Sequence, residues 1–261
     1  DMTKAKKVLK SLFLPAAIFT LWYLTSNAGI LNTYIIPPPQ EIFETAAVLI
    51  KKGTLAKHVA SSLYRVFFGF LLAFILAFPT AVLIGIIRPL EDYLILIIEF
   101  VRHVPPIACI PMLILWLGIG ESSKIAVIIL AAFFPIFLNT LNGVINCDYR
   151  LLEVGDVFGF SVKDKFFKII LPSAIPYVTV GMRLGLGYSW RALIGAELIA
   201  ASSGIGYMIM DAEQLSRPDI IIVGIITIGM LGYVIDLLFF SLTAKLSSWN
   251  KEGAKSWQEL E

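Results

Sequence analysis

Three charged side chains stand within one long apolar stretch of the chain: Arg183, Arg191 and Glu197. A charge is costly in hydrocarbon, so such a residue usually faces a cavity or a partner. If residues 176–200 form a helix, Arg183 lies about 10 Å and Arg191 about 22 Å from its start, with Glu197 near its far end. A guanidinium at that depth could bind an anionic solute. Our candidates for a solute pathway are Ser189, Trp190, Arg191 and Glu197.

Other roles remain open for the two arginines. Arg183 can extend its long side chain to the nearer membrane surface. Arg191 can instead form a structural ion pair with a carboxylate on a neighbouring helix. A further pair of charges, Glu99 and Arg102, is spaced i, i+3, and we expect these two side chains to pair with each other rather than with solute.

The chain shows no pattern that predicts catalysis or metal binding. His58 and His103 are far apart, and neither belongs to a cluster of cysteines or carboxylates at ligand spacing. The sequence has no G-x4-G-K-[ST] phosphate-binding loop, and its apolar runs hold no paired-carboxylate or Ser/Lys arrangement. We therefore expect a protein that is not an enzyme, with no catalytic residue, no metal site and no cofactor of its own.

The composition is that of an integral membrane protein. Apolar residues make up 58% of the chain and charged residues only 15%, against about 25% charged residues in soluble domains. The net charge of +2 is too small to indicate a nucleic-acid partner. Each membrane crossing needs about 20 residues, so the chain has room for about six helices.

We expect residues 1–261 to form one all-α transmembrane domain. Residues 40–57 are predicted to form an amphipathic helix at the membrane interface, and residues 202–219 an outer loop with a short helix. The first apolar run is interpreted as an uncleaved span. The six predicted spans cover approximately residues 12–31, 63–87, 93–117, 125–145, 176–200 and 220–244.

Two features within the spans concern packing. Pro105, Pro106 and Pro111 should break the third run near its middle, and such a break would line the inside of the bundle. Gly181 and Gly185 form a small-x3-small pattern, which lets another helix approach closely. That helix can come from the same chain or from a second copy.

A polar segment, residues 146–175, separates the fourth and fifth predicted spans. Asp148 can cap a first short helix, which Gly159 should end, and Ser161 can cap a second one. The prolines that follow disfavour helix in the residues before them, so the next long helix is expected to begin near Pro176. These features predict a compact, rigid protrusion between two spans.

This segment contains the pattern E-x-G-x3-G-x9-I-x-L-P, beginning at Glu153. The pattern resembles the EAA loop of the membrane subunits of bacterial ATP-binding-cassette importers, with Val154 and Gly155 at the positions usually held by two alanines. Three further segments are similar to the permeases of the sulfonate, taurine and nitrate importer family, whose relatives carry bicarbonate or thiamine and riboflavin precursors. They read RHVPPIACIPMLILWLGIGESSK, FPIFLNTLNGV and GMRLGLGYSWRALIGAELIAASSGIGY.

The resemblance implies a type I importer permease in the bacterial plasma (inner) membrane, working as a homodimer. It implies two cytoplasmic ATPase subunits, which would bind ATP and Mg²⁺, and an extracytoplasmic binding protein. The expected solute is a small anion such as a sulfonate, taurine or nitrate. Alternatives are a thiamine or riboflavin precursor, or a secondary transporter that needs no ATPase. The residues expected to couple the ATPase to the spans are Glu153, Gly155, Gly159, Leu171 and Pro172.

The distribution of Lys and Arg predicts the orientation. With the N-terminus inside, the cytoplasmic connections hold twelve of these residues and the outer connections five. Because short cytoplasmic loops are enriched in Lys and Arg, both termini and residues 146–175 are expected to lie in the cytoplasm.

Overall fold

The computed structural model describes residues 2–87 and 89–243, which are almost entirely helical and include no strand. The helices are α1 (Met2–Asn27), α2 (Pro39–Lys51), α3 (Thr54–Ile86), α4 (Pro89–Arg102), the 3₁₀ turn η1 (Pro106–Cys109), α5 (Ile110–Leu117), α6 (Glu121–Ile145), α7 (Tyr149–Val157), α8 (Val162–Lys165), the π turn η2 (Phe166–Ile170), α9 (Leu171–Ala200), α10 (Ile205–Gln214) and α11 (Pro218–Thr243).

Four stretches of this described chain are long and apolar enough to cross a membrane: α3, α6, α11 and the continuous run Val162–Ile199. A fifth crossing exists only if α4 and residues Pro106–Leu117 are taken as one span, which bends by 84°. The apolar part of α1, Leu12–Asn27, is shorter than the others. Four or five spans are thus recognised by length and composition within the described residues, and the sixth, at α1, stays a prediction.

Several predicted boundaries move because glycines turn the backbone. The first run, predicted to extend to residue 31, leaves the helix at Asn27, and Gly29 then takes a left-handed φ of 70°. The interfacial helix predicted at 40–57 ends at Lys51, and Gly53, with φ 72°, turns the chain directly into α3. The predicted end of the last span, residue 244, lies outside the described residues.

The prolines act differently in the third and fifth predicted spans. Pro105 and Pro106 break the third one, as expected. The fifth begins at Leu171 rather than near Pro176, which lies inside α9, and Pro172 stands directly after its first residue. Immediately before it, the Leu171 N–H donates to the Phe166 carbonyl five residues back, and this wider π turn keeps the helix continuous.

The core forms where α6 packs between α3 and α9. The α3 face consists of small residues at every fourth position, Ala73, Ala77 and Ala81, all fully buried. On α9, a Cβ added at Gly181 would lie 2.7 Å from Asn139 Cβ of α6. Small residues thus bring the helix axes together, as in many membrane bundles. The close partner of the Gly181 and Gly185 face is α6 of the same chain.

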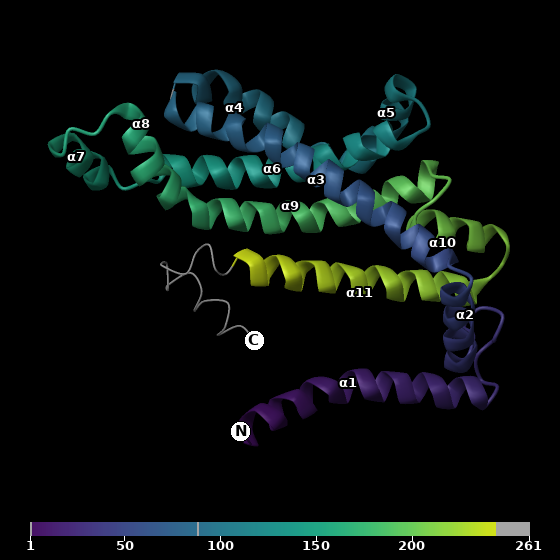
Figure 1. The fold of residues 1–261 in the computed structure, drawn as a ribbon. Coiled ribbons are helices and arrows are strands. Elements are labelled where there is room, and N and C mark those ends of the chain that lie inside the picture. Colours follow the sequence, from purple (N-terminus) through teal and green to yellow (C-terminus); the bar gives the residue numbers. More distant parts are fainter. Residues whose placement is uncertain (1, 88, 244–261) are drawn as a thin grey trace.

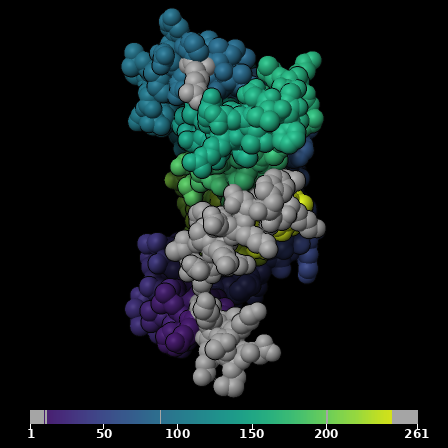
Figure 2. All heavy atoms as spheres, turned by 90° about the vertical axis from the view of Figure 1, so that its left-hand side faces the viewer, coloured from purple at the N-terminus to yellow at the C-terminus, as the bar shows by residue number. Residues whose placement is uncertain are grey.

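The two ends of the bundle are different (Figure 1). The α7–α8 segment protrudes at one end, and α2 and α10 lie at the other. The described chain begins in α1 and ends in α11 on the side of α7 and α8. Figure 2 looks onto this side, with the purple atoms of α1 in the lower part and the teal and green atoms of the bundle in the upper part. The protruding segment is shaped by side-chain caps at the starts of its two helices.

Candidate functional site

The protrusion, here called the hairpin, comprises residues 148–171 and is fixed by local hydrogen bonds. The Asp148 carboxylate accepts a bond from the Arg150 N–H at 2.9 Å and caps α7. Gly159 ends α7 with a φ of 68°, and the Phe160 N–H donates back to the Gly155 carbonyl at 2.9 Å. Ser161 and Asp164 form a capping box at the start of α8. These caps confirm the sequence prediction of two short helices joined at Gly159.

The interior of the hairpin is tightly packed. Gly155 is buried, and a Cβ at this position would lie 2.9 Å from Ile169 Cδ1. Lys165 forms an ion pair with Asp156 across the turn. A Cβ at position 155 would therefore require the Ile169 side chain to move, and α7 lies against η2. The hairpin continues through η2 into α9.

The outer surface of the hairpin is apolar at its tip, a feature that the sequence analysis missed. Val157, Phe158 and Val162 are 87%, 73% and 80% exposed, and they surround Gly159. Glu153 is also exposed, on α7. Exposed apolar patches bordered by charge are typical of protein contact sites. The signal in the sequence was the apolar residues on both sides of the predicted turn.

Arg183 has a structural partner on another helix. Its guanidinium donates to both carboxylate oxygens of Asp236 on α11, at 2.8 and 2.7 Å. The prediction that Arg183 extends to the membrane surface is therefore wrong, because this side chain forms an ion pair between α9 and α11. The expected pair of Glu99 and Arg102 is confirmed at 2.7 Å.

Arg191 is different from the other arginines. Among the residues that the structure describes, no carboxylate lies within ion-pair distance of it, and its Cζ atom lies 5.9 Å from the centre of the Tyr188 ring. The side chain is exposed and lines two cavities on either side of α9, of about 510 and 560 Å³. The predicted alternative of a structural ion pair is therefore not formed in the described part of the chain.

The other three pathway candidates are packed inside the protein. Ser189 is fully buried, and Trp190 belongs to the main apolar core, with its ring edge against Gly232 of α11. Trp190 also borders the larger cavity. Glu197 is 1% exposed and lies at the end of α9 opposite the hairpin. The structure thus brings Trp190 and Arg191 to one cavity and places Glu197 elsewhere.

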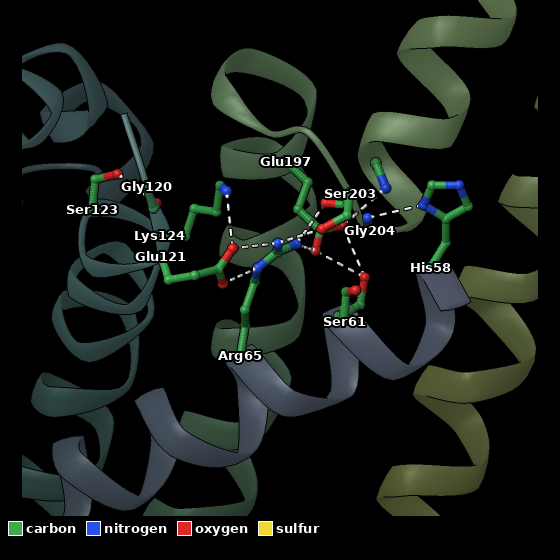
Figure 3. A network of polar contacts seen from close by, with 12 residues as sticks. His58, Ser61, Arg65, Gly120, Glu121, Ser123, Lys124, Glu197, Ser203 and Gly204 are labelled. Atoms are coloured by element: carbon green, nitrogen blue, oxygen red, sulfur yellow. Dashed lines mark hydrogen bonds and ion pairs between the residues drawn. The ribbon is translucent and has the colours of Figure 1, made fainter. Parts of the chain in front are cut away.

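Glu197 belongs to a buried polar network that the sequence analysis missed (Figure 3). Its carboxylate accepts bonds from Arg65 at 2.7 Å, from Ser62 at 2.8 Å and from the Gly206 N–H at 2.9 Å. Arg65 also donates to both carboxylate oxygens of Glu121 on α6, at 2.6 and 2.7 Å. The network joins α3, α6, α9 and the start of α10. The only sign of this network in the sequence was that opposite charges, Arg65 and Glu197, stand in separate apolar runs.

The loop between α9 and α10 is fitted to this network. Arg65 donates to the Ser203 carbonyl at 2.6 Å and to the Ser203 hydroxyl at 2.9 Å. A Cβ at Gly204, whose φ is 116°, would lie 2.2 Å from a Glu197 carboxylate oxygen. The Gly204 N–H donates to His58 Nδ1 at 3.1 Å. The polar groups of Arg65 and Glu197 bond to other protein groups, so we interpret the network as a structural anchor.

Long apolar helices, the hairpin, and Arg191 at two cavities without an ion-pair partner in the described chain are the features of a multi-span membrane transport protein. No group of three or more His, Cys, Asp or Glu side chains within the described chain could hold a metal ion. Residues 69–248 match the family described as "Binding-protein-dependent transport system inner membrane component". The chain belongs to this family and is a multi-pass permease subunit of the inner membrane.

Named relatives extend the match over most of the chain. A Bacillus subtilis permease named for aliphatic sulfonate transport, SsuC, is 40% identical over 92% of this chain and 87% of its own length. The taurine permease TauC of Escherichia coli is 31% identical, covering 95% and 92%. The bicarbonate permease CmpB of Synechocystis is 33% identical, covering 88% and 85%.

A solved structure supports the fold. The methionine ABC transporter MetNI, in an inward-facing conformation, matches with a TM-score of 0.65 at 19% identity, over 74% of this chain and 96% of that one. The similarity confirms the predicted importer-permease architecture. It carries no information on the solute, because the sequences have diverged widely.

Proposed function

We propose that this chain is the permease of an ATP-binding-cassette importer that moves a small anion into the cytoplasm. The named relatives are linked to sulfonates, taurine and bicarbonate, which share an oxyanion group. Arg191 favours the same class, because an unpaired guanidinium at a cavity suits a carboxylate or sulfonate.

The observation that carries the proposal is the hairpin. It is shaped by local helix caps, it has an apolar tip, and its second helix continues through the π turn into α9. We assign it the role of docking on a partner ATPase, which would bind ATP and Mg²⁺. Within it, Gly155 and Gly159 set the shape and Glu153 offers a charged contact. Leu171 and Pro172 set the π turn that joins the hairpin to the span.

The complete transporter would contain two copies of this chain, two ATPase subunits and an extracytoplasmic binding protein. In this assembly, ATP binding draws the ATPases together, and the two hairpins carry the movement to the spans. Of the pathway candidates, Arg191 would contact solute. Ser189 and Trp190 would hold its helix in place, and Glu197 would anchor the opposite end of α9.

Uptake measurements test this function. Vesicles containing the permease and its cognate ATPase and binding protein should accumulate labelled propanesulfonate or taurine only when ATP is present inside with the ATPase. A non-hydrolysable ATP analogue serves as the control. Uptake driven by an ion gradient without the ATPase would contradict the importer assignment and favour a secondary transporter.

A labelling scan tests the orientation. With the hairpin in the cytoplasm, single cysteines near Glu121 and Glu213 should react with an impermeant reagent from outside intact cells. Lys163→Cys, on α8, should react only after the cells are opened. The ends of α1 and α11 lie on the side of the hairpin, which agrees with both termini in the cytoplasm. Labelling of Lys163→Cys in intact cells would reverse the orientation.

A further inference from the structure

The third predicted span is broken between α4 and η1. Helix α4 ends at Arg102, η1 begins at Pro106, and the two helical segments meet at 84°. Residues 103–105 therefore lie outside regular helix, and Pro105 has an extended backbone. Such backbone is tolerated within a membrane only where it is buried in protein or lines an aqueous cavity. Here the break borders the cavity of about 510 Å³.

This cavity is held open between three elements. Its walls come from the break, α6 and α9. The break is seated on α9 through Ile107, whose Cδ1 would lie 3.0 Å from a Cβ at Gly195. Gly195 is one helical turn beyond Arg191, so the seating of η1 fixes the wall opposite that arginine. The cavity is thus part of the packed structure.

One end of the cavity is polar and has an uncompensated positive charge. Arg102 is neutralised by Glu99 at 2.7 Å, whereas Arg191 has no carboxylate partner in the described chain. Tyr188 and His103 line the same cavity. His103 Nδ1 donates to the Glu99 carbonyl at 2.6 Å, so Nε2 of the neutral ring carries a lone pair and offers no hydrogen bond to an anion. The Arg191 guanidinium and the Tyr188 hydroxyl supply the donors that suit a compact anion.

The remaining wall is apolar. It is formed by the side chains of Ile107, Leu130, Phe134, Leu138 and Leu184. Burying methylene groups against such a surface is favourable. A nitrate or bicarbonate ion has no group that could use this wall, whereas an alkyl chain could.

We infer that this cavity binds an anion with a compact oxyanion head and a short alkyl tail. The head lies at Arg191 and the tail lies along Phe134 and Leu138. This inference rests on the proposed function, since it gives that function a solute-binding site within the membrane. It also narrows the solute class to alkylated oxyanions such as small alkanesulfonates.

Binding to the full-length chain in lipid nanodiscs tests the inference, with methanesulfonate and 1-propanesulfonate as probes and ligand-observed NMR as the readout. Propanesulfonate should bind about tenfold tighter than methanesulfonate, because it adds two methylene groups. Arg191→Gln should weaken both probes at least tenfold. Phe134→Ala should weaken propanesulfonate several-fold and leave methanesulfonate unchanged. Lys51→Gln, which removes a distant exposed cation on α2, should change neither.

Specific outcomes overturn the inference. Equal affinity for the two probes, or binding that is insensitive to Arg191→Gln, would remove the site. An anionic lipid shares the chemistry of a charged head and an alkyl tail, so the nanodiscs are made first with phosphatidylcholine alone. If added phosphatidylglycerol abolishes propanesulfonate binding, the cavity is a lipid site. If ATP-dependent uptake continues while no probe binds, the site fails and the proposed function stands.

Discussion

Arg65→Met should destabilise the folded permease by about 3 to 5 kcal/mol, the usual cost of removing one member of a buried ion pair. Arg65 and Glu197 are 1% exposed, and their network joins three long helices. Without the guanidinium, the Glu197 carboxylate remains buried with only Ser62 and the Gly206 N–H. Reversible unfolding of the purified chain in nanodiscs, followed by circular dichroism, measures the loss.

A matched control is available in the same protein. Arg102→Met removes the same kind of side chain from a half-exposed i, i+3 pair with Glu99, and it should cost less than about 1 kcal/mol. The double variant Arg65→Met, Glu197→Gln should recover part of the loss, because a neutral amide tolerates burial better than a carboxylate. Equal losses for Arg65→Met and Arg102→Met would show that the network does not anchor the fold.

Gly159→Val should abolish most coupled transport while leaving the permease in the membrane. Gly159 has a φ of 68°, which a β-branched residue tolerates badly, and the backbone strain amounts to about 1 to 3 kcal/mol. That strain falls on the turn of the hairpin, between Phe158 and Ser161. We expect uptake to fall at least tenfold, with the ATPase bound weakly or hydrolysing ATP without transport. Glu153→Ala should show a milder defect.

Gly53→Val is a control that distinguishes the effect of backbone strain alone from the loss of coupling to the ATPase. Gly53 has a φ of 72° and open space around it, as Gly159 does, but lies at the opposite end of the bundle. The two variants therefore carry the same kind of backbone strain. Uptake and ATPase activity are measured for both in the assembled transporter. A similar loss in both variants, or normal uptake with Gly159→Val, would exclude the hairpin as the coupling element.

Local features were the most predictable from the sequence. The caps at Asp148 and Ser161 and the turn at Gly159 depend on side chains within a few residues, and the structure confirms them. A sixth span at α1 stays a prediction, because the apolar part of this helix, Leu12–Asn27, is shorter than the other spans. The predicted start of α9 near Pro176 was wrong, because the helix continues through the π turn Phe166–Ile170 and past Pro172. Residue preferences alone do not reveal such a turn.

The site was harder to predict because its geometry depends on distant segments. Glu197 resembles a pathway residue when it is considered beside Arg191 on one helix. Its partner Arg65 comes from a helix more than a hundred positions earlier in the chain. The cavity at Arg191 likewise required knowledge of where Ile107 docks. In each case the charge was visible in the sequence, and its partner was decided by tertiary packing.

The uninterrupted helical run from Val162 to Ile199 gives the chain the mechanics of a lever. Its main part, α9, has 30 residues and spans about 45 Å, so tilting the hairpin end by about 10° would displace the far end by about 8 Å. At that far end the run is bound through Glu197 to Arg65 of α3 and thereby to Glu121 of α6. These contacts would make the three helices swing as one block. In the proposed dimer, an outer gate opened by such a swing would form at the edge of the block, where it meets the second copy.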